Sequence, residues 1–154
     1  AGTRYVWLRV LAAYGPKDDP VHLIPAVILK LLAGEKPALT PGEQRWDYLY
    51  VDDVAEAACE VIQQPRLQGI YNLGSGQAYT VRDIVTRIRD MIDTGLPLGI
   101  GEIPYGPNQI MRLQGEGTDS PFCRETGWKP KVDLDEGLQQ TVDWFRANRQ
   151  RYGL

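Results

Sequence analysis

Apolar positions along the chain follow two alternating spacings, one typical of strands and one typical of helices. Residues 3 to 11, TRYVWLRVL, form a nearly continuous apolar run of the kind found in a buried strand. Residues 21 to 33 place apolar side chains three and four positions apart, which predicts a helix that ends at Gly34. Short strands are expected at residues 38 to 40 and, because of its Tyr and Val residues, at 47 to 51.

The middle of the chain predicts two more helices and a strand. The first of these helices is expected to begin at Asp52 or Asp53, since either carboxylate can cap a first turn. Its shared apolar face would comprise Val54, Ala55, Ala58, Val61 and Ile62. Residues 69 to 76, GIYNLGSG, predict a short strand that enters a glycine turn. Thr80, with Asp83 three positions later, marks the start of the second helix.

The last third begins with a long irregular stretch. Residues 95 to 118 are rich in Gly and Pro, which predicts a loop with short strands. Asp119 is expected to cap a short helix over residues 121 to 125 that ends at Gly127, and a final helix should cover residues 133 to 148. The inward residues of this final helix would be Leu134, Leu138, Val142 and Phe145. Strands that alternate with helices place the chain in the α/β class.

Composition narrows the range of partners. A net charge of -3 over 154 residues argues against a nucleic-acid partner, which would select a basic face. No apolar run approaches the roughly 20 residues that span a membrane, so no membrane partner is expected. Cys59 and Cys123 are too few for a disulfide framework and lack metal-ligand spacing, and Cys59 is expected to be buried in its apolar stretch. We therefore expect a cytoplasmic protein without a metal site.

The opening strand has no early partner in the sequence, and we expect the natural polypeptide to extend upstream of it. Its apolar run is typical of a strand that a sheet and helices cover on both faces. Without such cover, Val6, Leu8 and Val10, or the alternate set with Tyr5 and Trp7, should be exposed or paired with another chain. An unpaired apolar strand is a template for association. The sequence thus predicts self-association through this strand.

Four segments carry a resemblance to a known family. They are LRVLAAYGP at residues 8 to 16, WDYLYVDDVAEA at 46 to 57, GIYNLGSGQAYTVRDI at 69 to 84 and TGWKPKVDLDEGLQQTVDWF at 126 to 145. In this order they resemble the C-terminal half of the extended short-chain dehydrogenases that act on nucleotide sugars, the NAD-dependent epimerases and dehydratases. Each motif alone is common, but the four in register cover nearly the whole chain.

The resemblance implies a fold, a cofactor and a substrate class. It implies the C-terminal part of a Rossmann-type epimerase/dehydratase, with the last parallel strand followed by a small mixed α/β domain. Residues 1 to 16 would be the terminal strand of a dinucleotide-binding domain, and residues 17 to 154 the domain that binds a nucleotide-diphosphate sugar. NAD or NADP would be bound by the full-length protein, and Leu11 falls where the family places its residue beside the nicotinamide.

The resemblance also assigns residues to the substrate. His22 and Leu23 match positions at a helix start near the phosphates and sugar, where free N–H groups favour anions. His22 has no evident partner acid, so a place at the ligand rim or the surface is favoured over a role as general base. Leu39 and Thr40 match the strip along the base of the nucleotide.

Two further positions, Asn72 and Val81, match residues that flank the same pocket. For Asn72 an alternative is equally open: its amide could simply cap its own turn. Val81 lies at the predicted start of the helix that Thr80 caps. Both would therefore bring the glycine turn and the following helix to the ligand.

The chain departs from the family at three positions that contact phosphate or sugar. Ala12 replaces an Asn, while Trp46 and Gly106 each stand where the family has an Arg. The family binds its diphosphate with guanidinium groups, because bidentate charge-assisted bonds fix the geometry. Arg112, in a loop that could reorient it, is the favoured substitute, whereas strand alternation should point Arg45 away. Arg112 could also be a solvated loop charge, and Trp46 could stack on a ligand ring or simply pack.

No catalytic residue is assigned. The sequence holds no Tyr four positions before a Lys and no Gly-x-x-Gly-x-x-Gly turn after a strand, which are the family's acid/base pair and cofactor turn. Three hypotheses stay open. The full protein is an NAD(P)-dependent nucleotide-sugar epimerase or dehydratase of which this chain is an inactive piece, or a non-catalytic binding or regulatory relative, or a self-standing structural domain.

Overall fold

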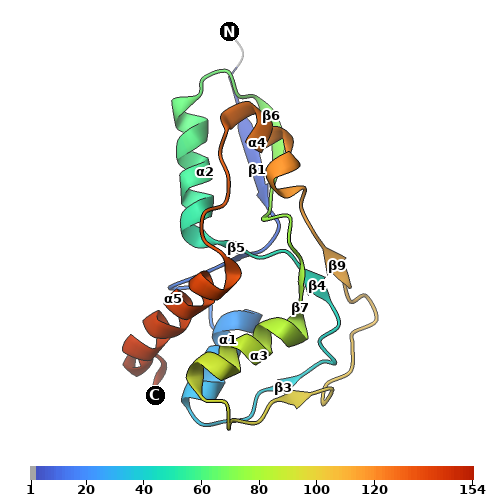
Figure 1. Ribbon diagram of the computed structural model, residues 1–154, viewed down its shortest axis with the longest axis vertical. Helices are drawn as coiled ribbons and strands as arrows, with labels where there is room; N and C mark the ends of the chain where they lie inside the picture. The colour runs from blue at the N-terminus through green and yellow to red at the C-terminus, as the bar shows by residue number, and fades with distance from the viewer. Residues whose placement is uncertain (1–2) are drawn as a thin grey trace.

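The computed structural model describes residues 3–154 and shows an elongated molecule with two bodies stacked along its long axis. In Figure 1 the upper body holds strands β1 (Val6–Val10) and β6 (Gly69–Leu73) with helices α2 (Val51–Gln63) and α4 (Pro121–Thr126). The lower body holds helices α1 (Leu23–Leu32), α3 (Val81–Ile92) and α5 (Leu134–Ala147). Each body has its own cluster of buried apolar side chains.

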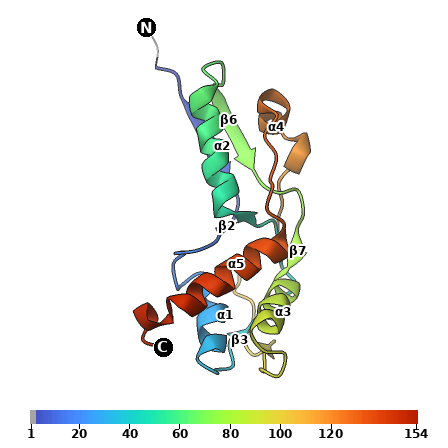
Figure 2. The ribbon, with the colours of Figure 1, turned by 60° about the vertical axis from the view of Figure 1, so that its left-hand side comes forward.

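The upper body is built on a parallel pair of strands. β1 and β6 run in register from Val6 opposite Gly69 to Val10 opposite Leu73. One face of this pair packs against α2 and α4 (Figure 2). Its buried residues are Leu49, Ala57, Leu67, Tyr71, Leu73, Phe122, Cys123 and Trp128. The parallel pairing confirms the predicted α/β class, although the partner of the opening strand lies about sixty residues further along the chain.

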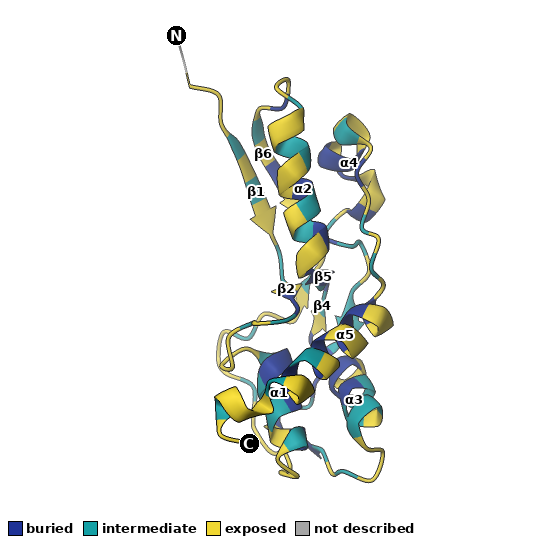
Figure 3. Ribbon diagram, turned by 90° about the vertical axis from the view of Figure 1, so that its left-hand side faces the viewer, coloured by how far each residue is buried: buried dark blue, intermediate teal, exposed yellow. Residues whose placement is uncertain are grey.

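The other face of β1 is open. Tyr5 and Trp7 are 59% and 60% exposed, and Ile70 opposite Trp7 is 48% exposed. Figure 3 shows this strand largely in the colour of exposed residues, in contrast to the interior of the lower body. Exposure of the alternate set with Tyr5 and Trp7 is therefore confirmed, whereas self-association through the strand stays a prediction.

In the lower body three helices pack on one another. Ile28, Ile84, Ile88, Leu138, Val142 and Phe145 are fully buried between them. Short strands frame the helices: β2 (Ala13–Tyr14) pairs with β5 (Leu49–Tyr50), β3 (Ala38–Leu39) with β8 (Gly99–Ile100), and β4 (Arg45–Trp46) with both β7 (Tyr79–Thr80) and β9 (Arg112–Leu113). Two 3₁₀ turns complete the fold, at Gly117–Asp119 and Arg149–Tyr152.

The predicted helix ends are partly right. Thr80 accepts a hydrogen bond from the Asp83 amide at the start of α3, as predicted, and Gly127 ends α4 with a left-handed φ of 79°. The prediction for Asp119 was wrong, because the Ser120 hydroxyl accepts the bond from the Cys123 amide that caps α4. The predicted domain boundary at residue 16 stays a prediction, and residues 1 and 2 of its first part lie outside the described residues.

The expectation for α2 also needs correction. The helix already begins at Val51, so neither Asp52 nor Asp53 is its cap. Asp53 instead lies buried on the helix and accepts hydrogen bonds from the amides of Lys131 and Val132, at 3.0 and 3.2 Å. Its carboxylate thus fixes the segment that leads into α5.

The buried face of α2 is only partly the predicted one, since Val54 and Val61 of the predicted set pack against the upper core. Ala57 and Asp53 are buried, whereas Ala55 and Ala58 are exposed and Ile62 is 76% exposed. Cys59 is exposed as well, so the expectation that it is buried was wrong. The helix itself carries small and apolar residues on most of its sides. Their spacing alone therefore did not identify the face that packs against the sheet.

Candidate functional site

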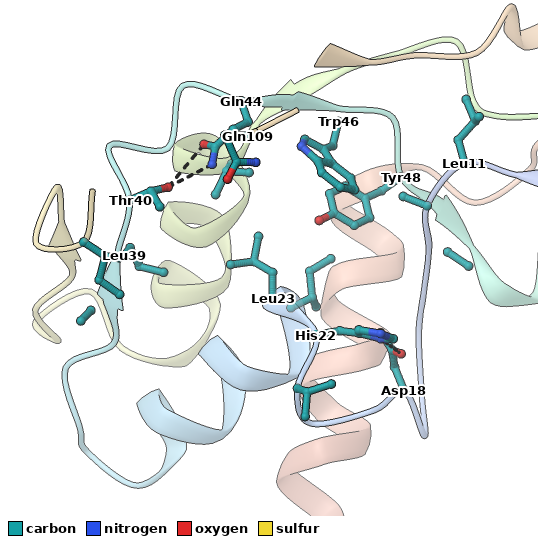
Figure 4. A pocket seen from close by; sticks show the side chains of 17 residues that line it. Leu11, Asp18, His22, Leu23, Leu39, Thr40, Gln44, Trp46, Tyr48 and Gln109 are labelled. Carbon is teal, nitrogen blue, oxygen red and sulfur yellow. Dashed lines mark hydrogen bonds and ion pairs between the residues drawn. The ribbon is translucent and has the colours of Figure 1, made fainter. Parts of the chain in front are cut away.

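A cavity of about 600 Å³ opens in the lower body, between the start of α1, the strands β3 and β4, and the loop that precedes β9 (Figure 4). Its lining combines an apolar wall with a few polar groups. The lining residues are Leu11, Ala12, Ala13, Asp18, Val21, His22, Leu23, Ile24, Ala38, Leu39, Thr40, Gln44, Trp46, Tyr48, Val81, Ile103 and Gln109. Concave, largely apolar sites with few polar groups are typical of small-molecule binding.

Six of the eight residues assigned from the resemblance meet in this cavity. They are Leu11, His22, Leu23, Leu39, Thr40 and Val81. They come from segments far apart in the sequence, which the folding of α1, β3 and α3 brings together. This convergence shows that the motifs share one cavity, while the role of each residue in binding stays a prediction.

Asn72 does not line the cavity. It lies on β6 in the upper body, exposed, with Arg9 of β1 as its register partner. Strand alternation explains this placement, because the neighbours Tyr71 and Leu73 point into the core and leave Asn72 on the open face.

Arg112 does not reach the cavity either, contrary to the expectation that a loop would reorient it. It lies in strand β9, in register with Arg45 of β4. Neighbouring strand residues face opposite sides, so both arginines lie on the side away from Trp46. Arg45 donates to the carbonyl of Ala78 at 3.0 Å, and Arg112 donates to the side chain of Gln114 at 2.5 Å. The prediction for Arg45 agrees with this geometry, whereas the role assigned to Arg112 lacks support from its placement.

Three amide and hydroxyl groups form the polar end of the cavity. Gln44 is only 5% exposed, and its Nε2 donates to Thr40 Oγ1 at 3.1 Å. Its backbone carbonyl accepts from the Val81 amide at 2.8 Å, which ties this strand to the start of α3. Gln109 completes the group in Figure 4. Sequence reasoning missed Gln44, although its position two residues before Trp46 places both on one face of an extended segment.

Aromatic rings form one wall. The rings of Trp46 and Tyr48 stack with centroids 6.2 Å apart and planes 25° apart. Burial, with a smaller contribution from the charge of Asp18, raises the pKa of Tyr48 to about 12. The phenol is therefore neutral at physiological pH and can act as a hydrogen-bond donor.

His22 has a partner acid that the sequence did not reveal. Its Nδ1 lies 2.8 Å from Asp18 Oδ1, four residues earlier. The hydrogen bond to Asp18, followed by the charges of Asp18 and Asp19, raises the pKa of His22 above its usual 6.5. Across residues 3–154, no Lys or Arg side chain lines the cavity, so His22 is the one group there able to carry positive charge.

The glycine turn after β6 is a structural element beside the cavity. Asp47 is fully buried and accepts hydrogen bonds from the amide and hydroxyl of Ser75, at 2.7 and 2.6 Å. The amides of Gly76 and Gly115 bond to the same carboxylate, at 2.8 and 2.9 Å. A Cβ at Gly74 would lie 2.7 Å from Asp47 Oδ2, so this close approach requires glycine. Asp47 thereby holds β4, and with it Trp46, against the turn.

A second, shallower hollow of about 440 Å³ adjoins the cavity. It is lined by Trp46, Gly106, Pro107, Asn108, Gln109 and Ile110. Trp46 and Gln109 belong to both. Gly106, which stands where the family has an Arg, therefore lies close to the aromatic wall but offers no side chain.

Comparisons with known proteins agree with this fold. Residues 1–74 match the NAD dependent epimerase/dehydratase family. Over 142 residues the chain is 34% identical to dTDP-glucose 4,6-dehydratase of Salmonella typhimurium, and this alignment covers 89% of this chain and 39% of that protein.

Two solved structures show the same architecture. One is UDP-N-acetylglucosamine 4-epimerase from Methanobrevibacter ruminantium in complex with UDP-N-acetylmuramic acid, with 26% identity, a TM-score of 0.84, and coverage of 94% of this chain and 47% of that chain. The other is dTDP-glucose 4,6-dehydratase from Bacillus anthracis in complex with NAD. It is 27% identical, with a TM-score of 0.82, and the alignment covers 94% of this chain and 45% of that chain.

The class that these similarities define is the Rossmann-type epimerase/dehydratase fold, of which the chain forms a part. The chain is similar to the extended short-chain dehydrogenase family, in its NAD-dependent epimerase/dehydratase group. It spans less than half the length of these relatives. Within the described part of the chain, no helix is both long and apolar enough to cross a bilayer, and His, Cys, Asp and Glu side chains form no group that could hold a metal.

Proposed function

We propose that this chain is the substrate-binding portion of an NAD(P)-dependent nucleotide-sugar epimerase or dehydratase, and that it is inactive by itself. The observation that carries the proposal is the cavity, in which six of the residues assigned to cofactor and substrate converge. Related proteins with a matching fold are described in complex with UDP-N-acetylmuramic acid or NAD. The ligand proposed for the cavity is therefore a nucleotide-diphosphate sugar.

The geometry suggests how a nucleotide sugar would lie. Leu23 and Ile24 at the start of α1 line the cavity beside His22, and the unpaired amides of a helix start favour anions, so this end suits the phosphates. Thr40 and Gln44, at the other end in Figure 4, suit a ring with polar edges. NAD or NADP would meet this chain through Leu11, which supplies one apolar contact for the nicotinamide, while the hydride chemistry belongs to the cofactor.

The sequence supports the proposal that the chain is inactive by itself. The acid/base Tyr and Lys of the family and the glycine-rich turn for the cofactor are absent from the 154 residues. Incubation with NAD or NADP and a panel of nucleotide sugars should give no turnover above a buffer blank. Turnover would contradict the proposal that this chain only binds. The cytoplasmic location stays a prediction, which fractionation of the source cells would test.

Binding is tested separately by calorimetry with the same nucleotide sugars. His22→Glu should abolish binding, because it places an extra carboxylate where the phosphates are proposed to lie. Ile62→Glu is the matched control, since Ile62 is 76% exposed on α2 and does not line the cavity. Equal affinity of the wild type and His22→Glu would refute this orientation of the ligand.

A non-catalytic binding protein is the second candidate. The observation that favours it is the absence of Lys and Arg from the lining of this cavity among residues 3–154, since a diphosphate is usually bound by guanidinium groups. The sequence of the intact gene separates the two. A Tyr-x-x-x-Lys pair and a glycine-rich turn upstream would favour the enzyme, and their loss would favour the binding protein.

A further inference from the structure

Trp46 lies where the two hollows meet. It lines both the cavity of about 600 Å³ and the shallower one of about 440 Å³. In Figure 4 its rings lie along the cavity between the polar end at Gln44 and Gln109 and the opposite end at His22. A ligand that fills the cavity therefore lies against this indole.

The indole is held before a ligand arrives. β4 is the central strand of a three-stranded sheet, so its backbone is fixed by β7 on one side and β9 on the other. Tyr48 stacks on the indole with planes 25° apart, and Asp47 between them is locked by its hydrogen bonds to the glycine turn. A preorganised aromatic surface loses little conformational freedom on binding, which favours ligand affinity.

The polar groups around the indole are neutral. Thr40, Gln44 and Gln109 offer a hydroxyl and two amides, and the neutral phenol of Tyr48 adds a donor. In the described chain neither hollow is lined by Lys or Arg, and the pair of Asp18 and His22 lies at the other end. The surroundings of the indole thus suit an uncharged ring with hydrogen-bonding edges better than a phosphate.

We infer that Trp46 is a stacking platform for an uncharged ring of the ligand, a nucleobase or a pyranose, in the place where the family resemblance has a phosphate-binding arginine. Gln109, on the wall shared by both hollows, contacts the edge of that ring. This inference rests on the proposed function and adds a substrate feature to it: ring stacking replaces one charge contact, so affinity depends on the ring more than on the phosphates.

Calorimetry on variants of Trp46 tests the inference, with UDP-glucose, dTDP-glucose, the two free nucleoside diphosphates, uridine, thymidine and glucose as probes. Trp46→Leu should weaken binding by roughly fivefold to a hundredfold, whereas Trp46→Phe, which keeps a ring, should stay within about threefold of the wild type. Trp7→Leu is the matched control, because Trp7 is 60% exposed on the outer face of β1, remote from the cavity. Circular dichroism confirms that each variant is folded.

Salt dependence gives a second readout that needs no variant. Guanidinium–phosphate contacts at an accessible site weaken with ionic strength, whereas stacking does not. Wild-type affinity should therefore change less than about threefold between roughly 0.05 and 0.5 M salt, and Trp46→Arg should make it more salt-sensitive.

Each outcome bears on a separate claim. Nucleotide-sugar binding that survives Trp46→Leu unchanged, or wild-type binding that falls steeply with salt, overturns the stacking inference and leaves the proposed function intact. Failure of the wild type to bind any probe overturns both. A loss with Trp46→Leu that the nucleosides share identifies the base as the stacked ring. A loss confined to the nucleotide sugars, and absent from the nucleoside diphosphates, identifies the sugar.

Discussion

The two bodies of the molecule differ in how completely they bury their apolar surface. In the lower body, helices α1, α3 and α5 pack on one another, and side chains such as Ile28, Ile88 and Phe145 have no exposed surface. In the upper body only one face of the β1–β6 pair is covered, and Tyr5 and Trp7 remain exposed on the other. Two parallel strands with one open face have little independent stability.

This difference matters because the cavity belongs to the better-packed body. Its walls come from α1, β3, β4 and the start of α3, all of which border the lower core. Two buried carboxylates connect the bodies: Asp47 binds the turn after β6, and Asp53 on α2 binds the segment before α5. The binding geometry should therefore depend on the lower core and on these carboxylates more than on the open sheet face.

The largest loss of stability should come from a substitution in the lower core. Phe145→Ala removes a ring with no exposed surface and should lower the free energy of unfolding by about 3–5 kcal/mol. Ile62→Ala, at a site 76% exposed on α2, should cost less than about 0.5 kcal/mol. Urea unfolding followed by circular dichroism measures both. Losses of similar size would show that Phe145 is not packed in the lower core as described.

The second-largest loss of stability should come from the carboxylate that joins the bodies, Asp47. Asp47→Asn removes the charge that accepts hydrogen bonds from Ser75, Gly76 and Gly115, and should cost about 2–3 kcal/mol in urea unfolding. Asp119→Asn, at an exposed position, is the control and should change little. If the two substitutions were equivalent, the glycine turn would not depend on Asp47.

The open sheet face should produce a weaker effect, visible as association. We expect the average mass to rise above the 17.3 kDa of one chain at high concentration, because β1 presents apolar side chains and a partly unpaired backbone. Trp7→Glu should return the mass towards that of the monomer without a large change in stability. Sedimentation or light scattering measures it, and a strictly monomeric wild type at high concentration would contradict the prediction.

The smallest expected change concerns the pKa of His22, which is the only histidine and therefore gives a single set of imidazole signals in NMR. Its pKa should lie above 6.5, because Asp18 bonds to the imidazolium, and Asp18→Asn should bring the pKa back down. Because folding raises the pKa of His22, its protonated ring stabilises the fold. This contribution is fully present below the pKa of the unfolded state and is lost as the pH rises through the pKa of the folded state. A pKa unchanged by Asp18→Asn would show that the pair does not form in solution.

Sequence reasoning predicted the regular parts of the fold and missed the contacts that depend on distant segments. The helices at Leu23–Leu32, Val81–Ile92 and Leu134–Ala147 were predictable because apolar spacing and local caps define them. The partners of Asp47 lie about thirty and seventy residues away and those of Asp53 about eighty, so no local pattern revealed them. The buried face of α2 was predicted only in part, at Val54 and Val61, because the position of the helix against the sheet selects that face.

The site was predictable to a comparable extent. Matching motifs gave six residues that line the cavity but assigned no part in the site to Gln44, Gln109 or Tyr48, whose places in the cavity arise from packing between elements. Arg112 was misplaced because its segment was expected to be a flexible loop, whereas pairing with β4 fixes its side chain on the opposite face. Pairing between distant strands is the information that the sequence pattern lacked.

Amide chemical-shift mapping tests the central claim, that the lower body holds the nucleotide-sugar site. The ¹⁵N-labelled protein is titrated with UDP-glucose and with dTDP-glucose, and the backbone amides are followed. We predict saturable shifts that are largest around the cavity, at His22, Thr40 and Val81, and small along β1 at Val6–Val10. Shifts concentrated on β1, or none with either ligand, would contradict the account.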